Sequence, residues 1–174
     1  MKKEFLLGNK AKDLYLYTKQ ITKPVPDDRV EARDVRRMLR QIASAKTPEQ
    51  MVELLKRTEE AMKSRKDRPR FPKSETFDLL ADIQETTKAI LKGVHSANET
   101  NFEADSEIRL RLIQETINDC NLLLKFIEIS LELGYIDIKR SAAWTKYTTD
   151  VKYMALAWLK KDRDRHQKAQ ERKD

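Results

Sequence analysis

The sequence predicts an all-α protein, and three observations lead to that prediction. The 174 residues include only three glycines and five prolines, which leaves few positions for the turns of a many-stranded sheet. Charged residues make up 37% of the chain and hydrophobic residues 39%, a balance typical of helices that keep one face in water. Apolar residues also recur at steps of three and four, which is the spacing of one helix face.

The first predicted helix covers about residues 3–22. Its inner face carries apolar or small side chains at Leu7, Ala11, Leu14, Thr18 and Ile21. The segment Lys23-Pro24-Val25-Pro26 ends this helix, because proline lacks the backbone N–H that would continue it.

Residues 27–70 are interpreted as a helical hairpin. One helix is expected from Asp27 to about Ala45 and a second from Thr47 to about Lys66. The run Thr47-Pro48-Glu49-Gln50 supplies an N-cap, a proline in the first turn and a capping-box glutamine. The run Arg68-Pro69-Arg70-Phe71-Pro72 that follows is expected to be extended, because a residue before proline avoids the α region.

Three longer helices are predicted over about residues 75–97, 106–133 and 138–165, with a polar loop at 98–105. Ser74 is expected to cap the first of them, and Gly134 to end the second in a left-handed conformation. The inner stripe of the first holds Phe77, Leu80, Ile83, Thr87, Ile90 and Val94. The stripe of the second holds Ile113, Ile117, Cys120, Leu124, Ile127 and Leu131. The stripe of the third holds Trp144, Tyr147, Val151, Met154, Ala155 and Trp158.

Together these segments predict one domain over residues 1–174, an antiparallel four-helix bundle. The basic hairpin 27–70 is inserted between its first and second helices. Helix 106–133 has more apolar groups than a helix wetted on one side needs, since Leu122, Leu123, Phe126, Ile129 and Leu133 lie off its main stripe. Two interpretations stay open: a central helix in a monomer, or a helix that also meets another subunit.

The charge of the chain is unevenly distributed. Residues 29–70 hold 13 lysines and arginines against 7 acidic residues, whereas residues 71–158 hold 10 against 14. A basic segment attached to an acidic body is typical of proteins that bind polyanions. At about 100° per residue, one stripe of the first hairpin helix consists of five arginines, opposite Val30, Val35, Met38, Leu39 and Ile42. The arginine stripe comprises Arg29, Arg33, Arg36, Arg37 and Arg40.

Guanidinium groups form bidentate hydrogen bonds with phosphate, so the arginine stripe is the first candidate nucleic-acid interface. A solvated surface with Glu31 and Asp34 interleaved is the alternative. The candidate residues are Arg29, Arg33, Arg36, Arg37, Arg40, Arg65, Lys66, Arg68, Arg70, Lys160, Lys161, Arg163 and Arg165. The last four belong to a tail with acids among its bases, which is equally a frayed, solvated helix end. Aromatic stacking platforms are few, and Tyr15, Tyr17, Tyr147 and Tyr153 are interpreted as core residues.

Candidate catalytic and metal-binding residues are scarce. His95 and Glu99 are spaced to share a metal, but a structural site takes three or four ligands and His166 lies in the tail. Neither histidine has the preceding glutamate of a di-iron bundle, or the arginine spacing of the helical RNase motif. Cys120 lies in an apolar stripe and is interpreted as a core residue. We expect a non-enzymatic protein without metal or cofactor and, since no apolar run nears the ~20 residues of a membrane span, a cytoplasmic one.

Several short runs resemble a known family. They are Phe71-Pro72-Lys73 followed by Phe77, Ala97-Asn98, Leu133-Gly134-Tyr135-Ile136-Asp137, Trp144-Thr145-Lys146, and Asp150-Val151-Lys152-Tyr153-Met154-Ala155-Leu156-Ala157-Trp158. They are similar to the accessory variability determinant (Avd) proteins of diversity-generating retroelements. The wider family includes small four-helix-bundle proteins encoded in intervening sequences of large-subunit ribosomal RNA.

The resemblance covers residues 71–162 well and residues 5–23 loosely. It implies a basic bundle that assembles as a homo-oligomer, a pentameric ring. Such a ring binds the element's reverse transcriptase, its template RNA and, as a further candidate ligand, complementary DNA, and it supports complementary-DNA synthesis without catalysing it. Residues 27–70 have no counterpart in the family pattern. The alternative function is a structural oligomerisation module whose basic hairpin docks an acidic protein partner.

Overall fold

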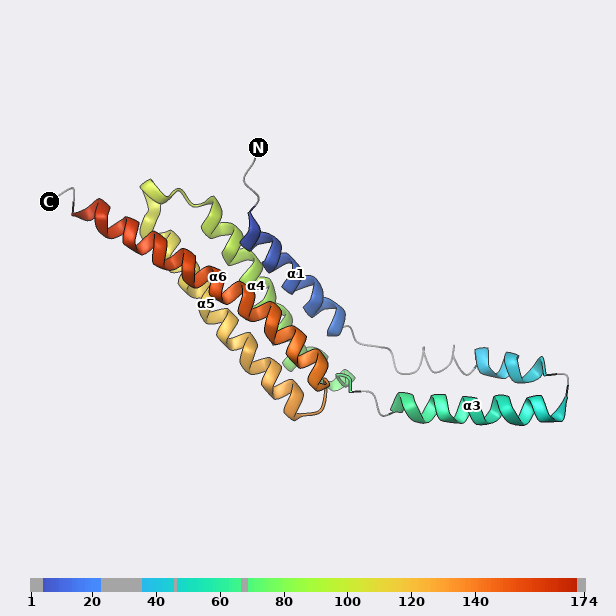
Figure 1. The fold of residues 1–174 in the computed structure, drawn as a ribbon. Coiled ribbons are helices and arrows are strands. Elements are labelled where there is room, and N and C mark those ends of the chain that lie inside the picture. The colour runs from blue at the N-terminus through green and yellow to red at the C-terminus, as the bar shows by residue number, and fades with distance from the viewer. Residues whose placement is uncertain (1–4, 23–35, 46, 67–68, 172–174) are drawn as a thin grey trace. The chain divides into compact units, whose positions relative to one another are not determined.

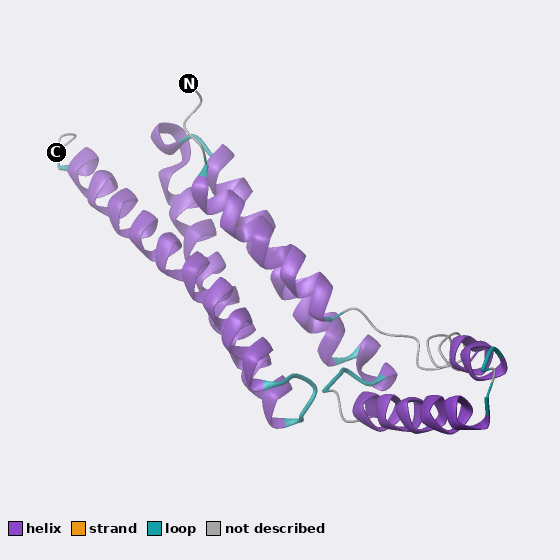
Figure 2. Ribbon diagram, turned by 45° about the vertical axis from the view of Figure 1, so that its right-hand side comes forward, coloured by secondary structure: helices purple, strands orange, loops and turns teal. Residues whose placement is uncertain are grey.

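The computed structural model describes residues 5–22, 36–45, 47–66 and 69–171. Its elements are α1 (Leu6–Ile21), α3 (Pro48–Lys66), the 3₁₀ helix η1 (Lys73–Phe77), α4 (Leu79–Glu99), α5 (Phe102–Glu132) and α6 (Ile138–Gln170), and residues 36–43 are also helical. These residues include no strand (Figures 1 and 2), so the all-α prediction is confirmed. None of the described helices is both long enough and apolar enough to cross a membrane.

Contacts within the chain divide it into two compact units. Met1–Lys23 and Phe71–Asp174 form one unit, here called the body, and Pro24–Arg70 forms the other, here called the arginine-rich unit. The body contains α1, η1, α4, α5 and α6. The arginine-rich unit contains the helix over 36–43 and α3.

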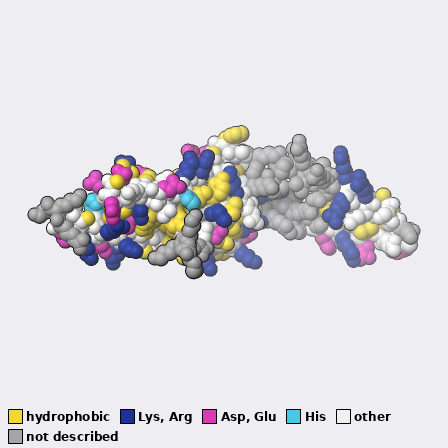
Figure 3. Space-filling model, turned by 90° about the horizontal axis from the view of Figure 1, so that it is seen from above, with side chains coloured by type: hydrophobic (Ala, Val, Ile, Leu, Met, Phe, Trp, Pro, Cys, Tyr) yellow, Lys and Arg dark blue, Asp and Glu magenta, His cyan; other side chains and the backbone are white. Residues whose placement is uncertain are grey.

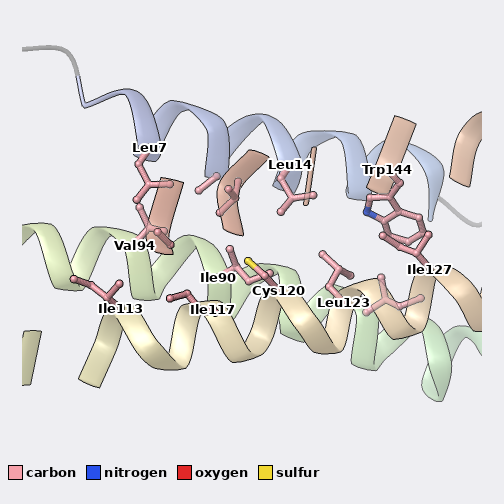
Figure 4. Close-up of a cluster of buried hydrophobic side chains, with 14 of the residues drawn as sticks. Leu7, Leu14, Ile90, Val94, Ile113, Ile117, Cys120, Leu123, Ile127 and Trp144 are labelled. Atoms are coloured by element: carbon pink, nitrogen blue, oxygen red, sulfur yellow. The ribbon is translucent and has the colours of Figure 1, made fainter. Parts of the chain in front are cut away.

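The four long helices of the body pack around a single hydrophobic core. α5 contacts α4 and α6, and α1 contacts the same two helices. Figure 1 shows α5 running back along α4, and α6 running back along α5. In Figure 4, side chains from all four helices point toward one another: Leu7 and Leu14 of α1, Ile90 and Val94 of α4, Ile113, Ile117, Cys120, Leu123 and Ile127 of α5, and Trp144 of α6.

Trp144 is the largest side chain that is completely buried, with 0% of its surface exposed. Its indole Nε1 donates a hydrogen bond to Oγ1 of Thr18 at 2.9 Å, which joins α6 to α1 across the core. A buried N–H left without an acceptor would destabilise the fold, so this pairing is what lets a tryptophan occupy the position.

The start of α4 differs from the prediction of a helix over 75–97. Lys73–Phe77 form a 3₁₀ helix, and Asp78, with φ −122° and ψ −110°, interrupts the backbone before α4 begins at Leu79. This interruption shifts the helical phase. Phe77 is therefore 93% exposed rather than on the inner stripe, and Ser74 is no α-helix cap. Phe71 is buried instead, with its ring centroid 5.4 Å from that of Tyr135.

The predicted polar loop over 98–105 is shorter than expected. α5 begins at Phe102 because the side chain of Asn101 caps it, accepting a hydrogen bond from the backbone N–H of Glu103 at 3.0 Å. Asp105 has non-helical torsions of φ −132° and ψ 43°, so the first turn of α5 is set off from the rest of the helix.

The connection between α5 and α6 follows the sequence signals closely. Gly134 has φ 71°, the left-handed conformation expected at the end of the helix. Asp137 then caps α6 by accepting a hydrogen bond from the backbone N–H of Arg140 at 2.7 Å. α6 continues to Gln170, beyond the predicted end at residue 165.

Candidate nucleic-acid interface

Three arginines of the predicted stripe lie within the described residues, and all three are exposed. Arg36, Arg37 and Arg40 stand on the helix over 36–43 and, with Gln41 and Ser44, line a recess in the surface. Figure 3 shows dark blue side chains at the surface of this unit. Arg29 and Arg33, the other two members of the stripe, lie outside the described residues.

The spacing of the arginines places them one helical turn apart. Residues 36 and 40 are related by i,i+4 and residues 37 and 40 by i,i+3, so the three guanidinium groups share one side of the helix. Met38 and Ile42, which point away from Arg36 and Arg40, are half-buried. Leu39 lies at the border between the two faces and is 58% exposed, which corrects its predicted place on the apolar side.

None of the three arginines forms an ion pair with a described residue, and the interleaved acids Glu31 and Asp34 lie outside the described residues. Like charges one turn apart weaken a helix by a few tenths of a kcal/mol per pair. An arginine stripe is therefore a feature that helix stability alone does not favour. In α3 the situation differs, because Arg57 pairs with Glu53 at 2.6 Å.

The other basic candidates of this unit lie at the end of α3 and in the link that follows it. Arg70 is exposed at the end of the extended link. For Arg65 and Lys66 the structure describes only the backbone, which belongs to α3, and Arg68 lies outside the described residues.

Two of the basic residues near the end of α6 contact α5. Lys160, Lys161, Arg163 and Arg165 are all exposed. Arg163 donates a hydrogen bond to Oε1 of Gln114 at 3.2 Å. Arg165 pairs with Glu103 at 3.1 Å, and its guanidinium carbon lies 4.1 Å from the centre of the Phe102 ring. Two of these four cations are thus engaged within the body.

A buried ion pair that no sequence pattern predicts holds this end of the body together. Nε of Arg109 donates to Oδ2 of Asp162 at 2.8 Å, with 17% and 6% of the two side chains exposed. Arg109 also donates to the carbonyl of Thr100 at 3.0 Å and lies 4.9 Å from the centre of the Trp158 ring. Residues 160–166 thus continue α6 as a helix that Asp162 joins to α5, while Lys160, Lys161, Arg163 and Arg165 remain exposed.

A second polar contact lies beside this ion pair. Oγ of Ser106 and Nδ1 of His166 are 2.8 Å apart. The recess between the start of α5 and the end of α6 is lined by Lys160, Lys161 and Arg165, and also by Glu103, Asp105 and Glu107. Because carboxylates border these cations, this recess attracts a polyanion less than does the helix over 36–43, here called the arginine helix.

Cys120 and His95 are among the residues considered for catalysis or metal binding. Cys120 is buried, and burial, with a smaller contribution from Asp119, raises the pKa of its thiol to about 12. A thiol that holds its proton so strongly is a poor nucleophile and a poor metal ligand at neutral pH. His95 lies beside the ring of Phe5, with the two centroids 5.9 Å apart. In the described part of the chain no three His, Cys, Asp or Glu side chains gather as metal ligands would.

No protein-family model, no curated protein and no solved structure matches the chain.

Proposed function

We propose that this chain is a non-enzymatic, nucleic-acid-binding accessory protein of a diversity-generating retroelement. In this proposal it is an antiparallel four-helix bundle with a basic helical hairpin inserted between its first and second bundle helices. It assembles as a homo-oligomer, binds the element's reverse transcriptase and template RNA, and supports complementary-DNA synthesis.

The residues that resemble the Avd family occupy structurally important positions, which supports the proposal. Phe71 is buried against Tyr135, Gly134 ends α5, and Trp144 fills the centre of the core. Val151 and Ala155, from the most specific run of the resemblance, are also buried. Chains that share a core are expected to be alike at such buried positions, although Phe77 and Tyr153 of the same runs are 93% and 66% exposed.

The observation that carries the nucleic-acid part of the proposal is the arginine helix. Arg36, Arg37 and Arg40 are exposed on one side of a helix in the arginine-rich unit, without a carboxylate partner among the described residues. Arginine is well suited to phosphate because its planar fork makes two parallel hydrogen bonds. The expected ligand is an RNA backbone, bound without reading base sequence.

The test replaces Arg36, Arg37 and Arg40 by glutamine. The matched control replaces Lys125, Lys139 and Lys146 of the body by glutamine, which removes the same charge from exposed positions. Affinity for unrelated RNA sequences is measured from about 0.05 to 0.5 M salt. Each lost phosphate contact should reduce the slope of log affinity against log salt by about 0.7 for single strands and about 0.9 for duplexes.

The expected result is a weaker, less salt-dependent binding of all RNAs by the arginine variant, with the control close to wild type. Helicity by circular dichroism should be unchanged in both. Equal RNA binding by the arginine variant and the control would remove the arginine helix as the interface.

Assembly is supported by apolar residues on the outer side of α5. Leu122, Ile129 and Leu133 are 46%, 40% and 53% exposed and follow one another at helical spacing, with half-buried Phe126 between them. Light scattering at micromolar concentration tests the oligomer, because a lone chain has a mass of 20.5 kDa. A monomer at that concentration would contradict this part of the proposal.

The partnership with a reverse transcriptase is tested separately. A gene for such an enzyme beside this one, followed by a template repeat, is the expected genomic context. The purified enzyme and template RNA should then yield more complementary DNA when this protein is added. Unchanged synthesis and no co-purification with the enzyme would reject this partner.

A second candidate function is a module whose basic hairpin docks an acidic protein. Exposed apolar side chains in the arginine-rich unit favour it, since Leu39, Val52 and Leu55 are each about half exposed, at 58%, 53% and 49%. Phosphate contact does not need apolar groups, whereas a protein interface uses them. Binding to an acidic protein that RNA does not displace would support this candidate over the first.

A further inference from the structure

A second basic surface lies on the body, between α1 and α4. A recess of about 390 Å³ is lined by Tyr15 and Lys19 of α1 and by Gln84, Glu85, Lys88, Ala89 and Lys92 of α4. It holds three lysines and one glutamate, although the stretch from 71 to 158 is acidic as a whole. Lys19 belongs to α1, whereas Lys88 and Lys92 belong to α4. Counting charges along the chain therefore could not detect this basic cluster.

The lysines of this recess have no carboxylate partner among the described residues, unlike some other cations of the body. Several body cations are neutralised by carboxylates: Lys10, Arg109, Arg111, Lys125, Arg140 and Arg165. Lys19, Lys88 and Lys92 form no ion pair with any described residue. Lys88 and Lys92 also stand one turn apart on α4, where two like charges repel.

Lys19 is held in place by a neutral group. Its Nζ donates a hydrogen bond to Oε1 of Gln84 at 2.8 Å, and the Gln84 amide nitrogen donates to Oγ1 of Thr22 at 3.3 Å. Thr22 is buried and donates to the carbonyl of Thr18 at 2.7 Å, so this chain of hydrogen bonds is anchored in the core. A neutral acceptor positions the ammonium group but leaves its charge uncompensated.

Tyr15 adds an aromatic surface to the same recess. The Nζ of Lys19 lies 5.8 Å from the centre of its ring. Tyr15 is half-buried and is not among the residues that pack against the core, unlike Tyr17 and Tyr147, so its predicted core role is wrong. Cations beside an accessible ring are the combination that binds single-stranded nucleic acid, because phosphates meet the cations and an unpaired base stacks on the ring.

We propose that the recess between α1 and α4 binds single-stranded RNA, with Lys19, Lys88 and Lys92 contacting phosphates and Tyr15 stacking on a base. This inference rests on the proposed function, for which it supplies a second, strand-selective contact surface. The arginine helix contacts backbone of any kind, whereas the recess needs a base that is free to leave its stack. Glu85 opposes binding at this surface because it is the one carboxylate in the lining.

The experiment uses the full chain, a 15-nucleotide oligouridine and a 15-base-pair RNA duplex. One variant replaces Lys19, Lys88 and Lys92 by glutamine, and the control again replaces Lys125, Lys139 and Lys146. If all three lysines neutralise phosphates, the oligouridine salt slope falls by about 2, which is up to about 100-fold in affinity at 0.1 M salt. The duplex should be affected much less, and the control should change neither.

Two single substitutions sharpen the test. Glu85→Gln should strengthen oligouridine binding, a gain that damage to the fold would not produce. Tyr15→Leu should weaken it by about 5- to 150-fold, the value of one stacked base, while Tyr15→Phe keeps the ring and should bind as wild type does. Circular dichroism of each variant confirms that the helices persist.

The outcomes separate the two proposals. Wild-type protein that binds neither RNA overturns the proposed function and this inference together. RNA binding that is lost in the arginine variant, with the lysine variant equal to the control, overturns only the recess. Equal losses for oligouridine and duplex would overturn the strand selectivity.

Discussion

The hydrogen bond between Trp144 and Thr18 offers a direct test of how the core is held together. Trp144 has no exposed surface, and its indole N–H has Oγ1 of Thr18 as its acceptor at 2.9 Å. Thr18→Val keeps the shape of the side chain but removes that acceptor. The indole N–H is then buried without a partner, which should lower the free energy of unfolding by about 1–3 kcal/mol.

A double-mutant cycle isolates this interaction from packing. Trp144→Phe removes the donor along with part of the ring and leaves a cavity, so by itself it mixes two effects. In the double variant neither donor nor acceptor remains, and Thr18→Val should cost little in that background. The coupling between the two substitutions should therefore be about 1–2 kcal/mol.

Thr148→Val is the matched control. Thr148 is also completely buried, but its Oγ1 donates to the carbonyl of Trp144 within the same helix at 2.9 Å. Removing this hydroxyl leaves no N–H unpaired, so Thr148→Val should cost less than Thr18→Val. Urea unfolding followed by tryptophan fluorescence reports on the body, because Trp144 and Trp158 both belong to it. Equal costs for the two threonine variants, with no coupling to Trp144, would refute the argument.

Three further predictions follow from individual contacts. The pKa of Cys120 is raised from its usual value near 9 to about 12 by burial, so the folded state holds a proton that the unfolded state releases. Stability, measured by urea unfolding, should thus fall as pH rises above about 9, and a Cys120→Ala variant should lose that component. Gly93→Ala would place a methyl group 2.4 Å from Oγ1 of Thr116, so it should destabilise the protein; with Thr116→Ala the same change should become stabilising by up to about 1 kcal/mol, the usual helix preference for alanine. Asp162→Asn should cost up to about 3–5 kcal/mol in thermal or urea unfolding because it leaves the Arg109 charge buried and unpaired, whereas replacing both residues by leucine should restore much of that loss.

Sequence periodicity predicted the buried positions where the inner face of a helix is continuous. Of the five residues predicted on the core side of α1, Leu7, Ala11, Leu14 and Thr18 are buried, and Ile21 is partly buried against the core. Gly134 was predicted as a left-handed helix end, and it has φ 71°. Such features depend on residues within a few turns of one another, so local sequence determines them.

Periodicity failed where a backbone interruption changed the helical phase. Phe77 fits the stripe of α4 by counting, yet it is 93% exposed because Asp78 breaks the helix between them. Asn101 caps the start of α5. An asparagine directly before the apolar Phe102 is a helix-start signal, and it could have shortened the predicted loop.

Contacts between distant segments were beyond the reach of sequence patterns. The ion pair of Arg109 with Asp162 joins residues 53 positions apart, and it turns a tail of mixed charge into a packed helix end. The recess with Lys19 and Lys88 likewise depends on how α1 meets α4. Charged residues that meet across helices lie at no fixed spacing in a single sequence, so such pairs are visible only in the structure.

The pairing of charges connects the fold to the proposed function. Cations that position helices in the body have carboxylate partners, as Arg109 has Asp162 and Lys10 has Asp150. Cations proposed to meet RNA have neutral partners or none among the described residues, as in the case of Lys19 and Arg36. A paired cation loses its partner when phosphate arrives, whereas an unpaired one gains an interaction and releases only a counterion from the RNA. RNA binding to this protein should therefore leave the body's ion pairs intact, and its salt dependence should come from the arginine helix and the α1/α4 recess.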